Sequence, residues 1–210
     1  MRAVAIAAVI VGAVILGNPS VSVAGPFANH PDALSDELTG SIPFNDGVGH
    51  RGVVDYAVFT AGDFNTNFSG FGYVPGDAFV YAYQVLSSGE YDITGFVVHL
   101  HGSANTIGAF KMGDVGPSTT QFVGAAAQWL FMTGLEDGQT SWALLFSSPE
   151  LPIHRFGEIL PPPIPYPNYV TVPTPYAAPV PEPGSLALLA TGAATAYIRR
   201  RATRSRSSNS

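Results

Sequence analysis

The sequence predicts an all-β domain built from antiparallel strands. Short runs of aromatic and β-branched residues alternate with turn-forming segments between residues 53 and 148. In the clearest run, at residues 78–86, the side chains alternate so that Phe79, Tyr81 and Tyr83 share one face of a strand. No stretch of this region sustains the 3.6-residue period of an amphipathic helix. We therefore expect an antiparallel β-sandwich of the jelly-roll or immunoglobulin-like type.

The expected strands follow one another at short intervals. They cover residues 53–59, 78–86, 92–101, 106–112, 121–132 and 141–148. The segments between them contain proline, which presets φ, and glycine, which tolerates positive φ, so they favour turns. Residues 47–52 match the pattern G-x-G-x-x-G, but they lie between a loop-like stretch and an expected strand. We interpret them as a connection and not as a nucleotide site.

The N-terminal residues predict export. Arg2 precedes an uncharged apolar run at residues 3–16, and Ser22 and Ala24 place small residues at positions −3 and −1 of a signal-peptidase site. We expect a signal peptide at 1–24. The other expected boundaries are 25–51 for an extended N-terminal arm, 52–150 for the β-sandwich, 151–179 for a proline-rich linker and 180–210 for a C-terminal sorting signal.

Three features follow one another near residue 180. The sorting motif Val180, Pro181, Glu182 and Pro183 precedes an uncharged run at 184–198, which ends at Arg199, Arg200 and Arg201. This layout resembles the PEP-CTERM sorting signal of Gram-negative-type bacteria, planctomycete-like ones among them. The resemblance implies export machinery and the membrane transpeptidase exosortase as processing partners. As a helix the run is about 22 Å long, so we expect only transient insertion in the inner membrane, with the arginines as the cytoplasmic stop-transfer signal.

The composition of residues 26–183 limits what the exported region can bind. This region has fifteen acidic and only three basic residues, Arg51, Lys111 and Arg155, so its net charge is −12. Such a charge argues against nucleic acid and anionic membrane surfaces as partners. The chain has no cysteine, so a hydrophobic core without disulfides must stabilise the domain.

Proline dominates the region after the expected sandwich. Twelve of the eighteen prolines lie between residues 149 and 183. We expect mostly polyproline II structure there, and a stalk on the order of 60 Å for residues 160–179. The alternative is a strand at 168–172 that lies against the edge of the sandwich.

Two sets of residues are candidates for a ligand site. His99 and His101 are two apart, so on a strand they project from one face and could hold Zn or Cu. The third ligand would have to be His50, His154 or a remote acid. We favour a solvated strand face for His99 and His101. The second set is aromatic and could form a sugar-stacking platform. It consists of Phe79, Tyr81, Tyr83, Trp129 and Trp142. We favour core packing for these residues.

Scattered carboxylates offer no single catalytic pair. A glycosidase pair could lie among Asp114, Glu136, Asp137, Glu150 and Glu158. Because the pattern selects none of them, we expect no catalytic residue, no bound metal and no cofactor.

The body of the chain is similar to a recurrent module of PEP-CTERM proteins. The similarity lies in residues 81–85, 129–131, 135–141 and 144–152 and implies no particular activity. We expect a non-enzymatic protein of the cell envelope or extracellular matrix with a structural or interaction role. The alternatives are a polysaccharide-binding module that uses an aromatic face, and a metal-dependent hydrolase centred on His99 and His101.

Overall fold

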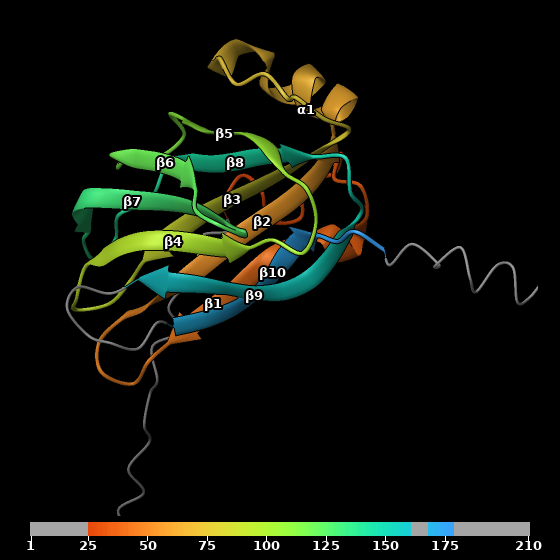
Figure 1. The fold of residues 1–210 in the computed structure, drawn as a ribbon. Helices are drawn as coiled ribbons and strands as arrows, with labels where there is room; N and C mark the ends of the chain where they lie inside the picture. The colour runs from red at the N-terminus through yellow and green to blue at the C-terminus, as the bar shows by residue number, and fades with distance from the viewer. Residues whose placement is uncertain (1–24, 161–167, 179–210) are drawn as a thin grey trace, which may run out of the picture.

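The computed structural model describes residues 25–160 and 168–178 of the chain. These residues form two five-stranded antiparallel sheets packed face to face, which confirms the predicted β-sandwich (Figure 1). The strand orders are β1-β2-β3-β8-β5 and β10-β9-β4-β7-β6. The predicted signal peptide, sorting motif and C-terminal apolar helix lie outside the described residues.

The strands follow the predicted runs closely in the middle of the chain. The first sheet consists of β1 (Thr39–Asn45), β2 (Arg51–Thr60), β3 (Phe79–Ser87), β8 (Ala143–Ser148) and β5 (Asn105–Phe110). The second consists of β10 (Asn168–Pro175), β9 (Pro152–Leu160), β4 (Ile93–His99), β7 (Ala126–Leu135) and β6 (Thr119–Phe122). One predicted run, 121–132, is divided between β6 and β7 by a turn at Gly124, whose φ is +57°.

Aromatic side chains fill the space between the two sheets. Tyr81 stacks on Phe146 with ring centroids 4.9 Å apart, and Phe96 stacks on Trp129 at 6.0 Å. Tyr83 lies between these pairs, and its hydroxyl donates a hydrogen bond to the backbone oxygen of Pro173. Burial raises the pKa of Tyr83 well above its ordinary value, so the hydroxyl stays protonated and remains a donor.

A second core covers the outer face of the first sheet. The helix α1 (Ala61–Phe68) places Phe64 and Phe68, four residues apart, against Phe59 of β2 and Phe27 of the N-terminal segment. Thr60 caps this helix by accepting a hydrogen bond of 3.2 Å from the backbone N–H of Asp63. The sequence pattern did not predict α1, because eight residues are too few for a recognisable 3.6-residue period.

Both predicted segments that flank the sandwich are corrected by the structure. The expected arm at 25–51 contains the short helix η1 (Asp36–Leu38) and the whole of β1, and Phe27 is fully buried. The expected proline-rich linker at 151–179 is wrong for residues 152–160 and 168–175, which form β9 and β10. The alternative of a strand at 168–172 is the correct one.

The prolines are compatible with strands because of where the strands lie. Pro43 belongs to β1, and Pro173 and Pro175 belong to β10, and each of these strands is at the edge of its sheet. An edge strand leaves every second N–H without a partner in the sheet, so proline costs no ladder hydrogen bond there. Pro152 is the first residue of β9, where proline is also tolerated.

The Gly-rich segment at 47–52 connects β1 to β2, as the sequence predicts, and its last two residues already belong to β2. Asp46 accepts backbone hydrogen bonds from Val48 at 2.8 Å and from Gly49 at 3.0 Å, and its other carboxylate oxygen lies 2.5 Å from Nδ1 of His50. Burial raises the pKa of Asp46, but these hydrogen bonds outweigh burial and lower it to about 2. Asp46 therefore stays ionised and fixes the turn.

Candidate functional groove

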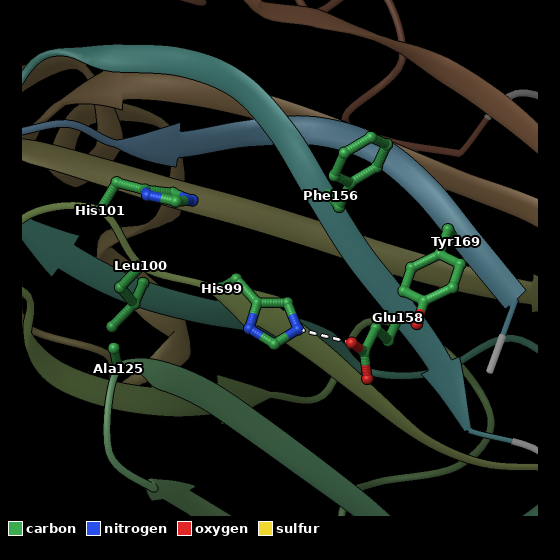
Figure 2. A pocket seen from close by; sticks show the side chains of 7 residues that line it. All are labelled: His99, Leu100, His101, Ala125, Phe156, Glu158 and Tyr169. Atoms are coloured by element: carbon green, nitrogen blue, oxygen red, sulfur yellow. Dashed lines mark hydrogen bonds and ion pairs between the residues drawn. The ribbon is translucent and has the colours of Figure 1, made fainter. Parts of the chain in front are cut away.

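A groove of about 490 Å³ opens on the outer face of the second sheet. Its walls come from the end of β4, from β9 and from β10, as Figure 2 shows. The lining residues are His99, Leu100, His101, Ala125, Phe156, Glu158 and Tyr169. The groove therefore depends on the two strands that the sequence had suggested to be a linker.

Strand alternation places the polar and aromatic groups of β9 and β10 on the outer face. On β9, Gly157 and Ile159 are buried, whereas Phe156 faces outward and Glu158 is only partly covered. On β10, Val170 is buried and Tyr169 is exposed. In the antiparallel register Glu158 is directly opposite Tyr169, so the three outward side chains form one continuous surface.

His99 and Glu158 form the polar part of the groove. Nε2 of His99 lies 2.6 Å from Oε1 of Glu158, and the two side chains point toward each other across β4 and β9 (Figure 2). The imidazole side chain is 43% exposed and the carboxylate side chain 21% exposed. Water and a ligand can therefore reach this pair, and the pair offers both a hydrogen-bond donor and an acceptor.

Phe156 and Tyr169 form the apolar part of the groove. Their ring centroids are 6.2 Å apart with an interplanar angle of 73°, an edge-to-face arrangement. Each residue is 62% exposed, although both are large and hydrophobic. The two rings thus leave an aromatic surface open to solvent beside the His99–Glu158 pair.

His101 does not join His99 in one cluster. β4 ends at His99, and His101 lies beyond it in an isolated bridge to Tyr176, with its N–H donating to the backbone oxygen of Pro175 at 3.2 Å. The two imidazole rings are well separated in Figure 2. Within residues 25–160 and 168–178, no three His, Asp or Glu side chains are placed to hold a metal ion.

The other histidines considered as third ligands lie elsewhere. His50 is fully buried against Asp46 and the ring of Tyr91. His154 packs edge-to-face on Tyr56 at 5.9 Å. Neither lines the groove, so the described part of the chain does not assemble the metal site considered from the sequence.

The aromatic stripe on β3 is core, as favoured from the sequence. Tyr81, Tyr83 and Trp129 are almost completely buried. Phe79 and Trp142 are half-buried, and the Trp142 ring covers Gly116. A sugar-stacking platform made of these residues is therefore incompatible with the fold. Of the scattered acids, Glu158 alone lines the groove.

The sequence interpretation missed Phe156 and Tyr169. Both lie in the proline-rich region, where the composition predicts polyproline II structure. Tyr169 had a partial signal, because it belongs to the run 168–172 that was the alternative strand. Phe156 had none, because the order apolar, glycine, polar, apolar at residues 156–159 does not alternate, and its outward position appears only in the folded strand β9.

In the described part of the chain, no helix has the length and apolar character needed to cross a membrane. The predicted run at 184–198, with Arg199, Arg200 and Arg201, lies outside that part, as do Ser22 and Ala24 of the predicted cleavage site.

No curated protein and no solved structure matches the chain. Residues 179–201 match the family model described as "PEP-CTERM protein-sorting motif", a range that includes Val180, Pro181, Glu182 and Pro183. The chain therefore carries a PEP-CTERM sorting motif, the signal of exported proteins that exosortase processes.

Proposed function

We propose that this protein is an extracellular-matrix or cell-surface protein whose β-sandwich binds polysaccharide without cleaving it. Export to the envelope or the extracellular surface follows from the PEP-CTERM motif. The role of the sandwich is argued from the groove, and a single observation carries it. Two large aromatic rings remain exposed beside a hydrogen-bonding pair on one face of a rigid sheet.

The exposed rings suit a sugar ligand. A pyranose presents an apolar C–H face, and an aromatic ring offers it a flat surface with little side-chain entropy to lose. Phe156 and Tyr169 lie on neighbouring antiparallel strands, so the paired backbones hold the two rings side by side before a ligand arrives. Preorganisation of this kind reduces the ordering cost of binding.

The polar pair suits the hydroxyl groups of the same ligand. Glu158 accepts hydrogen bonds through its carboxylate, and His99 can donate or accept through the ring nitrogen that does not face Glu158. Because a carboxylate lines the groove, neutral or cationic sugars fit better than strongly anionic ones. The net charge of −12 for residues 26–183 favours the same choice.

The chemistry of the groove favours binding over hydrolysis. Glycoside hydrolysis ordinarily requires two carboxyl groups that flank the scissile bond. Among the residues that line the groove, Glu158 is the one carboxylate. The metal-dependent hydrolase that the sequence left open would need at least three ligands in one place, and the described residues form no such cluster at His99 and His101.

Glycan binding can be tested on the purified exported protein. A glycan array identifies the sugar class, and co-sedimentation with insoluble polysaccharide from the producing cells gives the dissociation constant. We expect Phe156→Ala and Tyr169→Ala each to weaken binding at least about tenfold, the equivalent of ~1.4 kcal/mol.

Tyr91→Ala provides the matched control, because Tyr91 is 46% exposed and lies outside the groove. The proposal fails if the wild type binds no glycan, or if the three variants bind equally well. Steady release of reducing ends from a bound polysaccharide would instead show a hydrolase.

A further inference from the structure

Asp55 is a buried carboxylate in the middle of the first sheet. It lies on β2, opposite Ser41 of β1 and Gln84 of β3, and is 5% exposed. Ser41 donates its hydroxyl to one carboxylate oxygen, and the backbone nitrogen of Gly25 donates to the other at 2.5 Å. Burial raises the pKa of Asp55, and these two hydrogen bonds oppose the increase.

No cationic side chain of the described residues forms an ion pair with Asp55. The basic residues Arg51, Lys111 and Arg155 are all exposed. Removing a carboxylate from water is expensive unless a positive charge accompanies it. Asp55 therefore lacks the positively charged partner that a buried carboxylate usually has.

Gly25 fits this environment closely. A Cβ atom at residue 25 would lie 2.3 Å from the carboxylate oxygen of Asp55 and 2.8 Å from Oε1 of Gln84, so any larger residue would force these two side chains to move. The Gln84 amide nitrogen is already used, because it donates to the backbone oxygens of Met112 and Ser141. Oε1 of Gln84 is therefore turned toward Gly25 as an acceptor.

We propose that Gly25 is the N-terminal residue of the mature protein and that its α-ammonium group supplies the missing positive charge to Asp55. Signal-peptidase hydrolysis adds one water across the Ala24–Gly25 peptide bond. Ala24 keeps the new carboxylate, and Gly25 keeps an amine that takes up a proton. The single N–H that now reaches Asp55 becomes three, enough for both Asp55 and Oε1 of Gln84.

Two independent observations converge on this residue. The small residues Ser22 and Ala24 predict cleavage between residues 24 and 25 from the sequence alone. The structure places the nitrogen of the next residue against a buried acid with which no basic side chain of residues 25–160 and 168–178 pairs. Export processing would then complete the fold, and this conclusion does not depend on glycan binding.

The first test is the N-terminus of the exported protein. Edman sequencing or mass spectrometry should find Gly25 as the first residue. A start at any other residue overturns the proposal, because the α-amine would then not coincide with the backbone nitrogen at Asp55.

The second test compares two chains with the same C-terminus, one that begins at Gly25 and one that begins at Val23. At pH 6 the Gly25 form should melt higher by at least roughly 3 °C. The ion pair raises the pKa of the α-amine above its ordinary ~7.7–8.0. The added stability is therefore present below pH 7 and should disappear as the amine deprotonates toward pH 10.

Variants separate charge pairing from shape. With Asp55→Asn the two forms should have equal Tm, whereas Asp36→Asn, at an exposed acid of η1, should leave the difference unchanged. Equal Tm of the wild-type forms at pH 6 overturns the ion pair. So does a difference that persists unchanged at pH 10, since that would be steric. The comparisons at pH 6 and at pH 10 use only wild-type side chains, so they remain decisive even if the Asp55→Asn protein does not fold.

Discussion

The hydroxyl of Tyr81 donates a hydrogen bond of 2.9 Å to the backbone oxygen of Glu150, sixty-nine residues later in the chain. Tyr81 lies in the core on β3 of the first sheet, and Glu150 lies in the connection from β8 to β9, where the chain crosses to the second sheet. This bond ties the start of the crossover to the core. The proline-rich region then returns to the sandwich, where β9 pairs with β4 and with β10.

Tyr81→Ala should lower the free energy of unfolding by about 3–5 kcal/mol, because it removes a fully buried ring that stacks on Phe146. Tyr81→Phe should cost only about 0.5–1.5 kcal/mol, the contribution of the hydrogen bond. Urea denaturation measures both changes. Tyr169→Ala, at an exposed tyrosine, and His99→Ala should cost little. A Tyr81→Ala protein as stable as wild type would contradict the core assignment.

Removal of β10 should destabilise the domain. β10 contributes Val170 and Val172, both buried, to the core between the sheets. Each buried valine contributes about 1.5–3 kcal/mol, so a chain that ends at residue 160 should lose at least about 3 kcal/mol relative to one that ends at 178. Equal stability of the two chains by urea denaturation would restore the linker interpretation.

Asp46 should make the turn between β1 and β2 sensitive to acid. Its pKa is lowered to about 2 in the folded protein, against 3.8 for the ordinary carboxyl group. The stabilisation is present above pH 4 and is lost as the pH falls through 2. Asp46→Asn should thus lower Tm at pH 6 and reduce the fall in Tm between pH 4 and pH 2. A parallel pH profile in both proteins would contradict this account.

The sandwich was predictable from the sequence because its central strands carry regular alternation. The runs that became β3 and β8 are bounded by turn residues and need no information from distant parts of the chain. β1, β9 and β10 were harder to predict because they contain proline. Whether proline is tolerated depends on an edge position, as in β1 and β10, or on the first place in a strand, as in β9, and both depend on the folded sheet.

The groove could be predicted only in part, because it depends on contacts between strands that are far apart in the sequence. His99 was singled out as an outward residue on a strand, and it does lie on the outer face. Its partner Glu158 is fifty-nine residues away, and the register between β4 and β9 brings them together. No local pattern encodes that register.

Processing at the sorting motif yields a separate prediction. Glu182 is an acidic residue between two prolines, which we expect to keep the motif out of the helix predicted from the sequence for residues 184–198. We expect Glu182→Ala to trap an unprocessed form in the membrane of an exosortase-bearing host. Mass spectrometry of membrane and medium fractions measures this. Processing at the wild-type rate would show that Glu182 is not the recognised residue.

The arginine cluster should act differently from the motif. Moving an arginine to the bilayer centre costs at least about 2.5–3.5 kcal/mol, so three in a row should stop translocation. Replacing Arg199, Arg200 and Arg201 together with serine should release full-length protein that still carries its tail. Retention of this variant in the membrane would show that the apolar run alone is sufficient.

The most direct test of the central claim is an NMR titration of the exported protein, labelled with ¹³C at Phe and Tyr rings, against polysaccharide from the producing cells. The account predicts that the ring signals of Phe156 and Tyr169 shift with a common dissociation constant, while those of the buried Tyr81 and Tyr83 stay in place. Ring signals that do not move at saturating polysaccharide, or shifts confined to residues outside the groove, would contradict it.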